Sequence, residues 1–322
     1  MVEQQETMNR ETTTLSKPFT VEPMHKVDPA MYPSAVVDYF AHYGLDGDWC
    51  EARHLFGSFE SAGFTLAAHL YEPSNYIATA VLLHGYLNHS GQFRHLIRFL
   101  LDKGFAAAVY DLPGHGLSSG PAAAIESFDQ YVQTAQDFLK LVKGYLIGPF
   151  YAVGFSTGAA ILTEMMLEKS EGDLGKIVLA APLIHWTAYE QSKGTYKIYS
   201  AFTDKIARFH RKNSSDKDFL VFNKTQDYLH AKHLSLKWVK ALFDWNDQIE
   251  SMNPCDREVL VLQGDKDGTV EWKYNLNLLS RKFPNVRIEM IAGANHELFN
   301  EAAEYRQQAL ALIGKYFQDQ LA

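Results

Sequence analysis

Apolar positions along this chain fall into short runs and into longer segments with helical spacing, and from residue 77 onward the two alternate. Strands are predicted at residues 78–83, 105–110, 149–153, 176–181, 259–263 and 286–291, and the run at 149–153 is typical of a buried strand. Helices are predicted at residues 92–103, 128–142, 159–168, 271–283 and 297–317. Strands that are separated by helices favour a parallel sheet covered on both faces. In such a sheet, a site lies beyond the carboxyl ends of the strands.

The chain before residue 77 predicts a hairpin and a helix. Residues 53–72 alternate apolar and polar positions around a turn at residues 61–63, which is typical of an antiparallel hairpin. Residues 33–43 predict a helix that Gly44 can end and that covers a sheet edge, with its apolar face formed by Val36, Phe40 and Tyr43. The polar residues 1–30 predict a flexible or loosely docked arm.

Residues 183–252, called the cap segment below, interrupt the alternation. The segment is rich in Trp, Tyr and Phe and carries many charges. A stretch of this length within a globular chain should have structure of its own, so we predict a helical cap over the strand ends. The predicted organisation is an arm with a short helix at residues 1–50, a core formed by residues 51–182 and 253–322, and the cap segment inserted into that core.

The composition limits the classes of partner and compartment. With 322 residues, 47% of them hydrophobic, the chain can bury one large core. A net charge of −8 without a basic tract argues against nucleic acid as a partner. The sequence shows no signal peptide and no run near the roughly 18 apolar residues of a membrane span. Cys50 and Cys255 are too few for a disulfide framework, and a bridge between them has no support. We therefore expect a soluble, cytoplasmic protein.

A candidate nucleophile lies between the strand predicted at residues 149–153 and the helix predicted at residues 159–168. Gly154, Ser156 and Gly158 form the pattern Gly-x-Ser-x-Gly between a strand and a helix, which is typical of a nucleophile elbow. The chain reverses so sharply at such a serine that side chains two residues away would collide. The serine hydroxyl is then presented at a helix N-terminus, where backbone N–H groups face developing negative charge.

A serine needs a base to take its proton and an acid to orient that base. When a nucleophile elbow carries the serine, the chain order is serine, acid, histidine. Asp267 follows the strand at residues 259–263 and is the predicted acid, with Asp265 as a competitor in the same loop. His296 follows the last strand and is the only histidine after that acid, so it is the predicted base.

Main-chain groups near the elbow are candidates for an oxyanion hole. Tyr86 follows the strand at residues 78–83, and Thr157 follows the candidate nucleophile. We predict that the backbone N–H groups of these two residues stabilise the oxyanion.

Other polar residues near the strand ends are predicted to be structural. The glycine-rich turn at residues 111–118 lacks the lysine and the spacing of a phosphate loop, so Asp111 and His115 are expected to hydrogen-bond neighbouring loops. Glu297 and Glu301 are expected in the first turn of the last helix, where the helix dipole favours acids.

Five motifs resemble the α/β-hydrolase superfamily, and within it the monoacylglycerol lipase and lysophospholipase group. They are VLLHGY, YDLPGHGLSSG, VGFSTGA, LVLQGDKDGTV and GANHELFNE, which occur in the family's order across about residues 55–318 apart from the cap segment. The chain differs at Phe155-Ser156-Thr157, where these enzymes more often have His-Ser-Met or His-Ser-Leu. The resemblance implies an α/β-hydrolase fold and a serine hydrolase of carboxylic esters that needs no cofactor and no metal. It also implies that Ser156, Asp267 and His296 are the catalytic residues.

The aromatic cap segment suggests a small-molecule ester or lipid with an apolar acyl group, such as a monoacylglycerol or a lysophospholipid. Trp186 and Tyr189 are candidate substrate-binding residues, although such aromatics can also form the cap segment's own core. Peripheral membrane contact through the cap segment and the oligomeric state are left open. The alternatives are an aminopeptidase, a thioesterase or a carbon–carbon hydrolase with the same residues. A binding protein that keeps the fold without catalysis is the alternative from another class.

Overall fold

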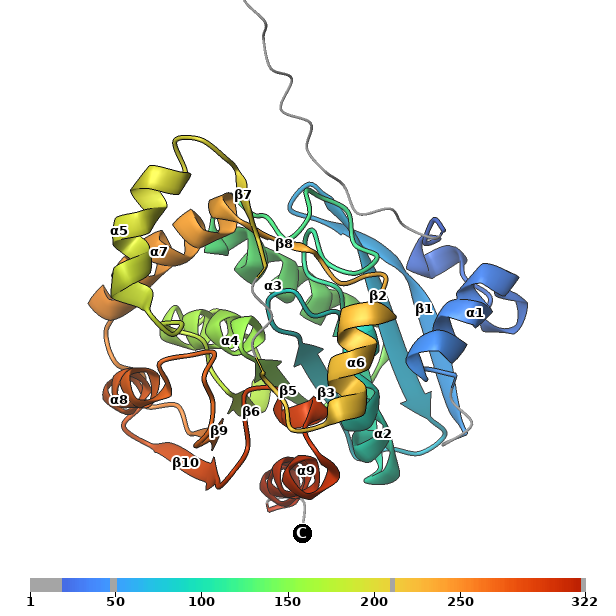
Figure 1. Ribbon diagram of the computed structural model, residues 1–322. Helices are drawn as coiled ribbons and strands as arrows, with labels where there is room; N and C mark the ends of the chain where they lie inside the picture. The colour runs from blue at the N-terminus through green and yellow to red at the C-terminus, as the bar shows by residue number, and fades with distance from the viewer. Residues whose placement is uncertain (1–18, 47–50, 209–211, 320–322) are drawn as a thin grey trace, which may run out of the picture.

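The computed structural model describes residues 19–46, 51–208 and 212–319. Within them, an eight-stranded sheet has the order β1-β2-β4-β3-β5-β6-β9-β10 (Figure 1). Its strands are β1 (Ala52–Ser61), β2 (Phe64–Pro73), β3 (Ala78–Leu83), β4 (Phe105–Tyr110), β5 (Phe150–Phe155), β6 (Leu174–Ala180), β9 (Val259–Gly264) and β10 (Val286–Ile291). From β4 to β10 every neighbouring pair is parallel, as predicted.

The predicted hairpin forms the antiparallel edge of this sheet. Strands β1 and β2 pair in register from Ala52 opposite Pro73 to Ser61 opposite Phe64, and β2 pairs antiparallel with β4. The connecting turn needs positive φ at both central residues, 49° at Ala62 and 80° at Gly63. Such a turn matches the twist of the paired strands.

Helices cover both faces of the sheet. They are α1 (Ser34–Tyr43), α2 (Arg94–Asp102), α3 (Phe128–Tyr145), α4 (Thr157–Leu167), α8 (Trp272–Lys282) and α9 (Ala303–Gln318). Side chains along a strand alternate between two apolar clusters, with Val81 and Leu83 in one and Ala80 and Leu82 in the other. Apolar residues of α3, α4 and α8 belong to the first cluster, and those of α1, α2 and α9 belong to the second.

The cap segment contains helices and an unpredicted small sheet. Its elements are α5 (Tyr189–Tyr199), β7 (Lys205–Ala207), α6 (Lys217–Thr225), β8 (His233–Ser235) and α7 (Leu236–Ser251). Strands β7 and β8 pair antiparallel, from Lys205 opposite Ser235 to Ala207 opposite His233. Three-residue strands are too short to carry a periodic signal, which explains why the sequence did not predict them. In Figure 1, α5, α7, β7 and β8 lie together along one side of the molecule.

The described part of the N-terminal arm packs more tightly than predicted. It begins with the short 3-10 helices η1 (Met24–Lys26) and η2 (Pro29–Met31). Met24 is buried against the core, and α1 buries its predicted apolar face before it ends at Gly44, whose φ is 64°. Residues 1–18 lie outside the described residues, so the prediction of a flexible arm stays untested there. Cys50 also lies outside them, so a bridge to Cys255 is untested as well.

The helix predicted over residues 297–317 is present as α9, but its predicted start is wrong. The structure has the 3-10 helix η4 (Leu298–Asn300), an extended Glu301 and then α9. Glu297 and Glu301 are therefore not first-turn acids of that helix, and both are buried. The Glu301 carboxylate instead accepts backbone N–H groups of Ser215 at 2.6 Å and Asn295 at 2.7 Å. These contacts hold two loops together and break the helix at this point.

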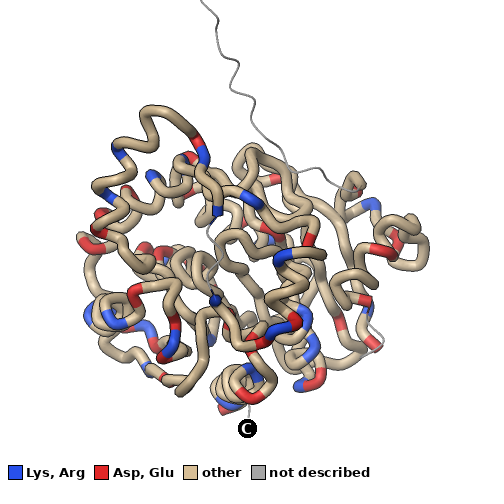
Figure 2. Tube along the Cα trace, viewed as in Figure 1, with Lys and Arg blue, Asp and Glu red and all other residues tan. Residues whose placement is uncertain are grey.

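Charged residues are distributed over the whole fold. Figure 2 shows basic and acidic residues interspersed along the described chain. Among the residues that the structure describes, none of the helices has the length and apolar character needed to cross a membrane.

Candidate active site

Ser156 lies at the turn between β5 and α4 with a strained backbone. Its φ is 52° and its ψ is −108°, outside the regions that non-glycine residues normally occupy. A Cβ atom at Gly154 would collide with the Gly158 carbonyl, and one at Gly158 would collide with the Leu83 carbonyl. The two glycines therefore allow the sharp turn that presents Ser156 at the start of α4.

The structure brings Ser156, His296 and Asp267 together in one hydrogen-bonded chain. His296 Nε2 lies 3.1 Å from Ser156 Oγ, and His296 Nδ1 lies 2.7 Å from Asp267 Oδ2. Because a carboxylate only accepts, Nδ1 carries the imidazole proton, and Nε2 is left free to accept from the serine hydroxyl. All three side chains are buried, and they come from the loops after β5, β9 and β10.

Asp267, and not Asp265, is the acid that contacts His296. Asp267 Oδ1 also accepts the backbone N–H of Thr269 at 2.8 Å, and its Oδ2 accepts from Gln263 Nε2 at 3.0 Å. Asp265 Oδ1 accepts the backbone N–H of Gly293 at 2.7 Å. Asp265 therefore joins two loops, whereas Asp267 fixes the orientation of the histidine ring.

The charges of this pair stabilise each other. Burial alone would lower the pKa of His296, but the charge of Asp267 and its hydrogen bond outweigh burial and raise it. Burial alone would raise the pKa of Asp267, but the charge of His296 and the hydrogen bonds from His296, Gln263 and Thr269 together outweigh burial and lower it. The site thus favours a protonated His296 beside an ionised Asp267, which is the state that forms when the histidine accepts a proton.

The two predicted oxyanion donors lie on adjacent loops, and their side chains also make contacts. The Tyr86 N–H donates to Thr157 Oγ1 at 3.2 Å. The Tyr86 hydroxyl donates to the Ala123 carbonyl at 2.9 Å and accepts the Ser235 N–H at 3.0 Å. The Tyr86 ring stacks on the ring of Trp238, with centroids 3.6 Å apart. The side chain of Tyr86 therefore joins the loop after β3 to β8 and α7 of the cap segment.

A second contact, which the sequence did not predict, links the Tyr86 loop to the histidine loop. Asn88 Nδ2 lies 3.3 Å and 3.4 Å from the carboxylate oxygens of Glu297, the neighbour of His296. Asn213 and Asn300 also donate to that carboxylate, each at 3.3 Å. The carboxylate of Glu297 is thus held by three amides, which fixes the loop beside His296.

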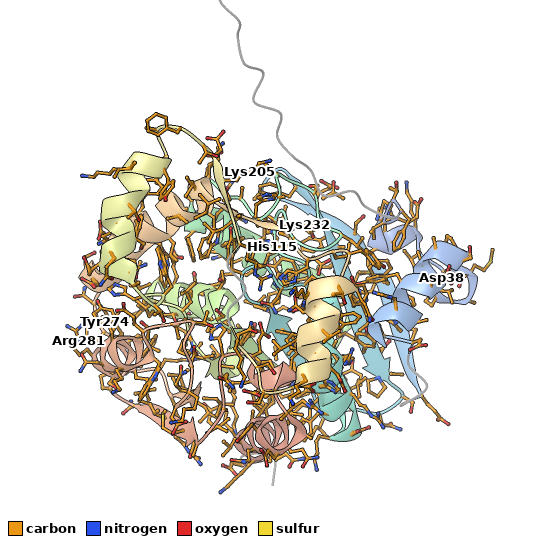
Figure 3. All side chains as sticks on the ribbon, in the orientation of Figure 1. Asp38, His115, Lys205, Lys232, Tyr274 and Arg281 are labelled. Carbon is orange, nitrogen blue, oxygen red and sulfur yellow. The ribbon has the colours of Figure 1, made fainter. Side chains whose placement is uncertain are left out.

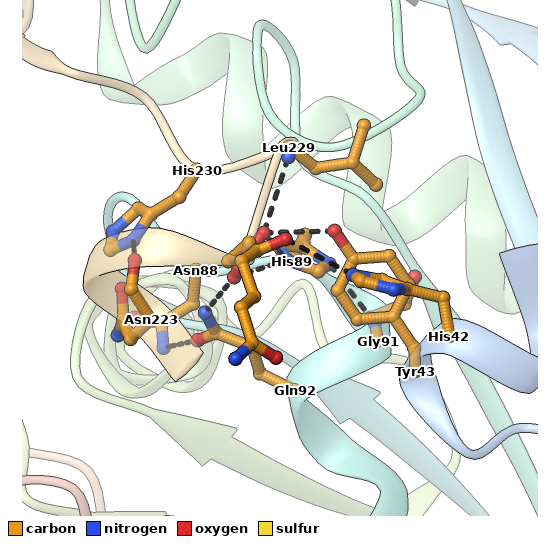
Figure 4. A network of polar contacts seen from close by, with 12 residues as sticks. His42, Tyr43, Asn88, His89, Gly91, Gln92, Asn223, Leu229 and His230 are labelled. Carbon is orange, nitrogen blue, oxygen red and sulfur yellow. Dashed lines mark hydrogen bonds and ion pairs between the residues drawn. The ribbon is translucent and has the colours of Figure 1, made fainter. Parts of the chain in front are cut away.

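The carboxylate of Asp227, between α6 and β8, contacts α1 and the segment after β3, and Figure 4 labels its partners Tyr43, His89 and Gln92. It lies 3.0 Å from Nε2 of His89 in the loop after β3, and it accepts from Gln92 Nε2 at 2.7 Å. It also accepts the hydroxyl of Tyr43 in α1 at 2.9 Å. Burial opposes the charges of this pair, yet the pKa of His89 is raised and the pKa of Asp227 is lowered by their mutual attraction.

In the glycine-rich turn at residues 111–118, Asp111 hydrogen-bonds a neighbouring loop as predicted, whereas His115 does not. Asp111 accepts the backbone N–H groups of Ser90 and Leu117, each at 2.7 Å. His115 bonds within its own turn, from Nδ1 to the Pro113 carbonyl at 2.9 Å, and burial lowers its pKa to about 3. Figure 3 shows His115 in the packed interior, while Asp38 and Arg281 lie at the periphery.

Trp186 and Tyr189 lie in an aromatic cluster of the cap segment. Tyr189 is buried, stacks on His185 with centroids 3.6 Å apart, and contacts Trp186 edge-on at 5.0 Å. Phe243 of α7 packs against both rings. These rings belong to the apolar cluster that also contains residues of α3, α4 and α8, so they pack the cap segment against the core. The role of the two residues in substrate binding stays a prediction.

Comparison with known proteins identifies the family. The model of Hydrolase_4, the serine aminopeptidase S33 family, matches residues 74–303. This chain belongs to that family. The predictions of an α/β-hydrolase and of an ester hydrolase are confirmed by this match together with relatives that are named monoglyceride lipase and monoacylglycerol lipase.

Three curated relatives illustrate the range of the family. Homo sapiens monoglyceride lipase is 27% identical over 239 residues, which are 69% of this chain and 76% of that protein. Phospholipase YtpA of Bacillus subtilis is 22% identical over 248 residues, which are 70% of this chain and 90% of that protein. An uncharacterized abhydrolase domain-containing protein of Dictyostelium discoideum is 24% identical over 237 residues, 71% of this chain, and the match spans only 25% of that longer protein.

The fold is also found among solved structures. A soluble variant of monoglyceride lipase from Saccharomyces cerevisiae, in complex with a substrate analog, superposes with a TM-score of 0.70. It is 15% identical, and the match covers 82% of this chain and 94% of that one. At this identity the likeness shows the α/β-hydrolase fold, in agreement with the predicted fold class.

Proposed function

We propose that this protein hydrolyses carboxylic esters with apolar acyl groups through Ser156, His296 and Asp267. The observation that carries the proposal is the continuous hydrogen-bonded chain from Ser156 Oγ through His296 to Asp267, at 3.1 Å and 2.7 Å. An activated serine requires this order of nucleophile, base and orienting acid.

The proposed reaction has two halves. Ser156 Oγ attacks the ester carbonyl carbon while His296 Nε2 takes the hydroxyl proton, and the ionised Asp267 stabilises the imidazolium that forms. The oxyanion accepts hydrogen bonds from the backbone N–H groups of Tyr86 and Thr157. His296 then gives its proton to the leaving alcohol, and the acyl group stays on Ser156. Water, deprotonated by His296, attacks the acyl-enzyme and releases the carboxylic acid.

The substrate class is proposed to be a lipid with one acyl chain, a monoacylglycerol or a lysophospholipid. The relatives named monoglyceride lipase and phospholipase support this class, as does the number of aromatic rings in the cap segment. The name of the family also keeps an aminopeptidase as the second candidate.

Peripheral contact with a lipid surface fits the exposed end of α5. Ile198, Tyr199 and Phe202 are 63%, 53% and 84% exposed, and they are neighbours at one end of the cap segment. Exposed apolar groups of this kind mark interaction sites. The cytoplasmic location stays a prediction.

A fluorophosphonate probe followed by peptide mass spectrometry tests the proposal. Wild-type protein should be labelled on Ser156, and Ser156→Ala should be neither labelled nor active. Unlabelled wild-type enzyme should then be assayed on p-nitrophenyl esters of graded chain length, monoacylglycerols, lysophosphatidylcholine and amino-acid p-nitroanilides. Cleavage of the anilides without the esters would favour the aminopeptidase. A folded wild-type protein that is not labelled would instead be a binding protein.

A further inference from the structure

The hydroxyl of Thr157 lies beside the proposed oxyanion donors. Thr157 is the first residue of α4 and is fully buried. Its Oγ1 accepts the N–H of Tyr86 at 3.2 Å. Its own backbone N–H is at the helix N-terminus, where such groups have no partner within the helix. Two proposed donors and one hydroxyl thus meet next to Ser156.

The proton of this hydroxyl has no acceptor among the described residues. A threonine hydroxyl can donate once and accept twice, and the Tyr86 N–H uses only one acceptor position. Thr163 of the same helix shows the usual arrangement, because its buried hydroxyl donates to the Ala159 carbonyl at 2.8 Å. A buried donor without an acceptor is unfavourable. Thr157 therefore holds an unused donor at the place where the reaction creates negative charge.

We propose that the Thr157 hydroxyl is a third donor of the oxyanion hole. An oxyanion that takes the N–H of Tyr86 must lie along that N–H, which now points to Thr157 Oγ1. Rotation about the Thr157 Cα–Cβ bond moves Oγ1 aside, so that the hydroxyl lies beside the oxyanion, and rotation about the Cβ–Oγ1 bond turns its proton toward the oxyanion. The exchange makes and breaks hydrogen bonds only, and the proton stays on Thr157.

In the resting enzyme the same hydroxyl takes the place of the oxyanion. It accepts the N–H of Tyr86 and keeps that N–H directed toward the site before the substrate arrives. The enzymes that the chain resembles more often carry Met or Leu at this position, and neither side chain can donate a hydrogen bond. The third donor is therefore a property of this chain's own Phe155-Ser156-Thr157 sequence.

The inference rests on the proposed ester hydrolysis, and Thr157→Val tests it. Valine keeps the branched shape and removes the hydroxyl. On p-nitrophenyl butyrate, Thr157→Val should lower kcat by at least about tenfold with KM nearly unchanged, because one oxyanion donor contributes only in the transition state. The rate of inactivation by a fluorophosphonate should fall in parallel. Thr157→Ser should recover most of the loss, and Thr163→Val, the matched control in α4, should leave kcat within about twofold.

The outcomes separate this inference from the proposed function. A Thr157→Val enzyme with wild-type or higher kcat would overturn the third donor while leaving the ester hydrolase intact. The third donor is also overturned if Thr157→Ser loses as much as Thr157→Val, because shape and not the hydroxyl would then decide the rate. If Thr157→Val does not fold, the comparison of Thr157→Ala with Thr157→Ser replaces it. A wild-type protein that neither hydrolyses esters nor is labelled on Ser156 would overturn both proposals.

Discussion

The ring of Trp238 in α7 stacks on the ring of Tyr86, with the ring planes only 15° from parallel. Tyr86 is the residue whose backbone N–H is proposed to bind the oxyanion, and Trp238 belongs to the cap segment. The cap segment is therefore in direct contact with the loop that carries Tyr86. A shift of α7 would be transmitted to the Tyr86 backbone through a buried, stacked ring.

Tyr86→Phe tests whether the Tyr86 hydroxyl connects the loop after β3 to the cap segment. Phenylalanine keeps the stack on Trp238 but leaves the Ala123 carbonyl and the Ser235 N–H without their partner. Each unpaired group lowers stability by about 1–3 kcal/mol, so urea unfolding should show a loss within that range or above it. Because the loop that carries Tyr86 also loses its hydrogen bonds to Ala123 and Ser235, kcat should fall while KM changes little. A variant with full stability and full kcat would show that the hydroxyl contacts are irrelevant to the loop.

Asn88→Ala should reduce kcat by disconnecting the Tyr86 loop from Glu297 beside His296. We expect a loss of about tenfold, because small displacements of catalytic groups reduce rates strongly. Asn285→Ala is the matched control, since the Asn285 amide donates to the Asp256 carbonyl at an exposed site. Equal kcat values for the two variants would remove any positioning role from Asn88.

The acid limb of the pH–rate profile should reflect the ionisation of His296. The base must be neutral to accept a proton, so kcat/KM should rise with pH through an apparent pKa above the ordinary 6.5, since Asp267 raises the pKa of His296. Asp267→Asn should move this limb to lower pH and reduce kcat by about 10⁴-fold, because the orienting charge is lost. Asp265→Asn should leave the limb in place and reduce kcat far less. If Asp265→Asn proves the more damaging variant, the acid has been wrongly assigned.

Asp227→Asn should destabilise the protein in a pH-dependent way. Removing one partner of a buried ion pair typically lowers stability by about 3–5 kcal/mol. The raised pKa of His89 means that its contribution is complete below pH 6.5 and is lost as pH rises through the raised value. The lowered pKa of Asp227 means that its contribution is complete above the ordinary carboxyl pKa of about 4.

The difference in unfolding free energy between wild type and Asp227→Asn should therefore be largest between about pH 4 and pH 6.5 and should shrink toward alkaline pH. Asp218→Asn, an exposed position on α6, is the control and should show no such dependence. A difference that is constant from about pH 5 to pH 9 would mean that His89 and Asp227 do not interact as an ion pair.

Much of the core could be predicted from local patterns in the sequence. The strands β3 and β4 begin and end where the apolar runs predicted, because a buried parallel strand leaves a continuous apolar run. The edge strand β10 also has its predicted bounds, although only its last residue is buried. The positions of Ser156, Asp267 and His296 followed from the same pattern, since each comes directly after a predicted strand. Parallel strands place their carboxyl ends at one edge of the sheet, so the three residues had to come close together.

The tertiary structure decided the contacts that depend on distant residues. The break of the last helix at Glu301 and the pairing of Asp227 with His89, 138 positions away, have no local signature. The same is true of Tyr86, whose ring and hydroxyl are fixed by residues of the cap segment. A carboxylate or a phenol in a sequence shows what it can bond to, but its partner is set by which loops the packed core brings together. For that reason the sequence predicted the candidate catalytic residues, whereas only the fold showed what holds them in place.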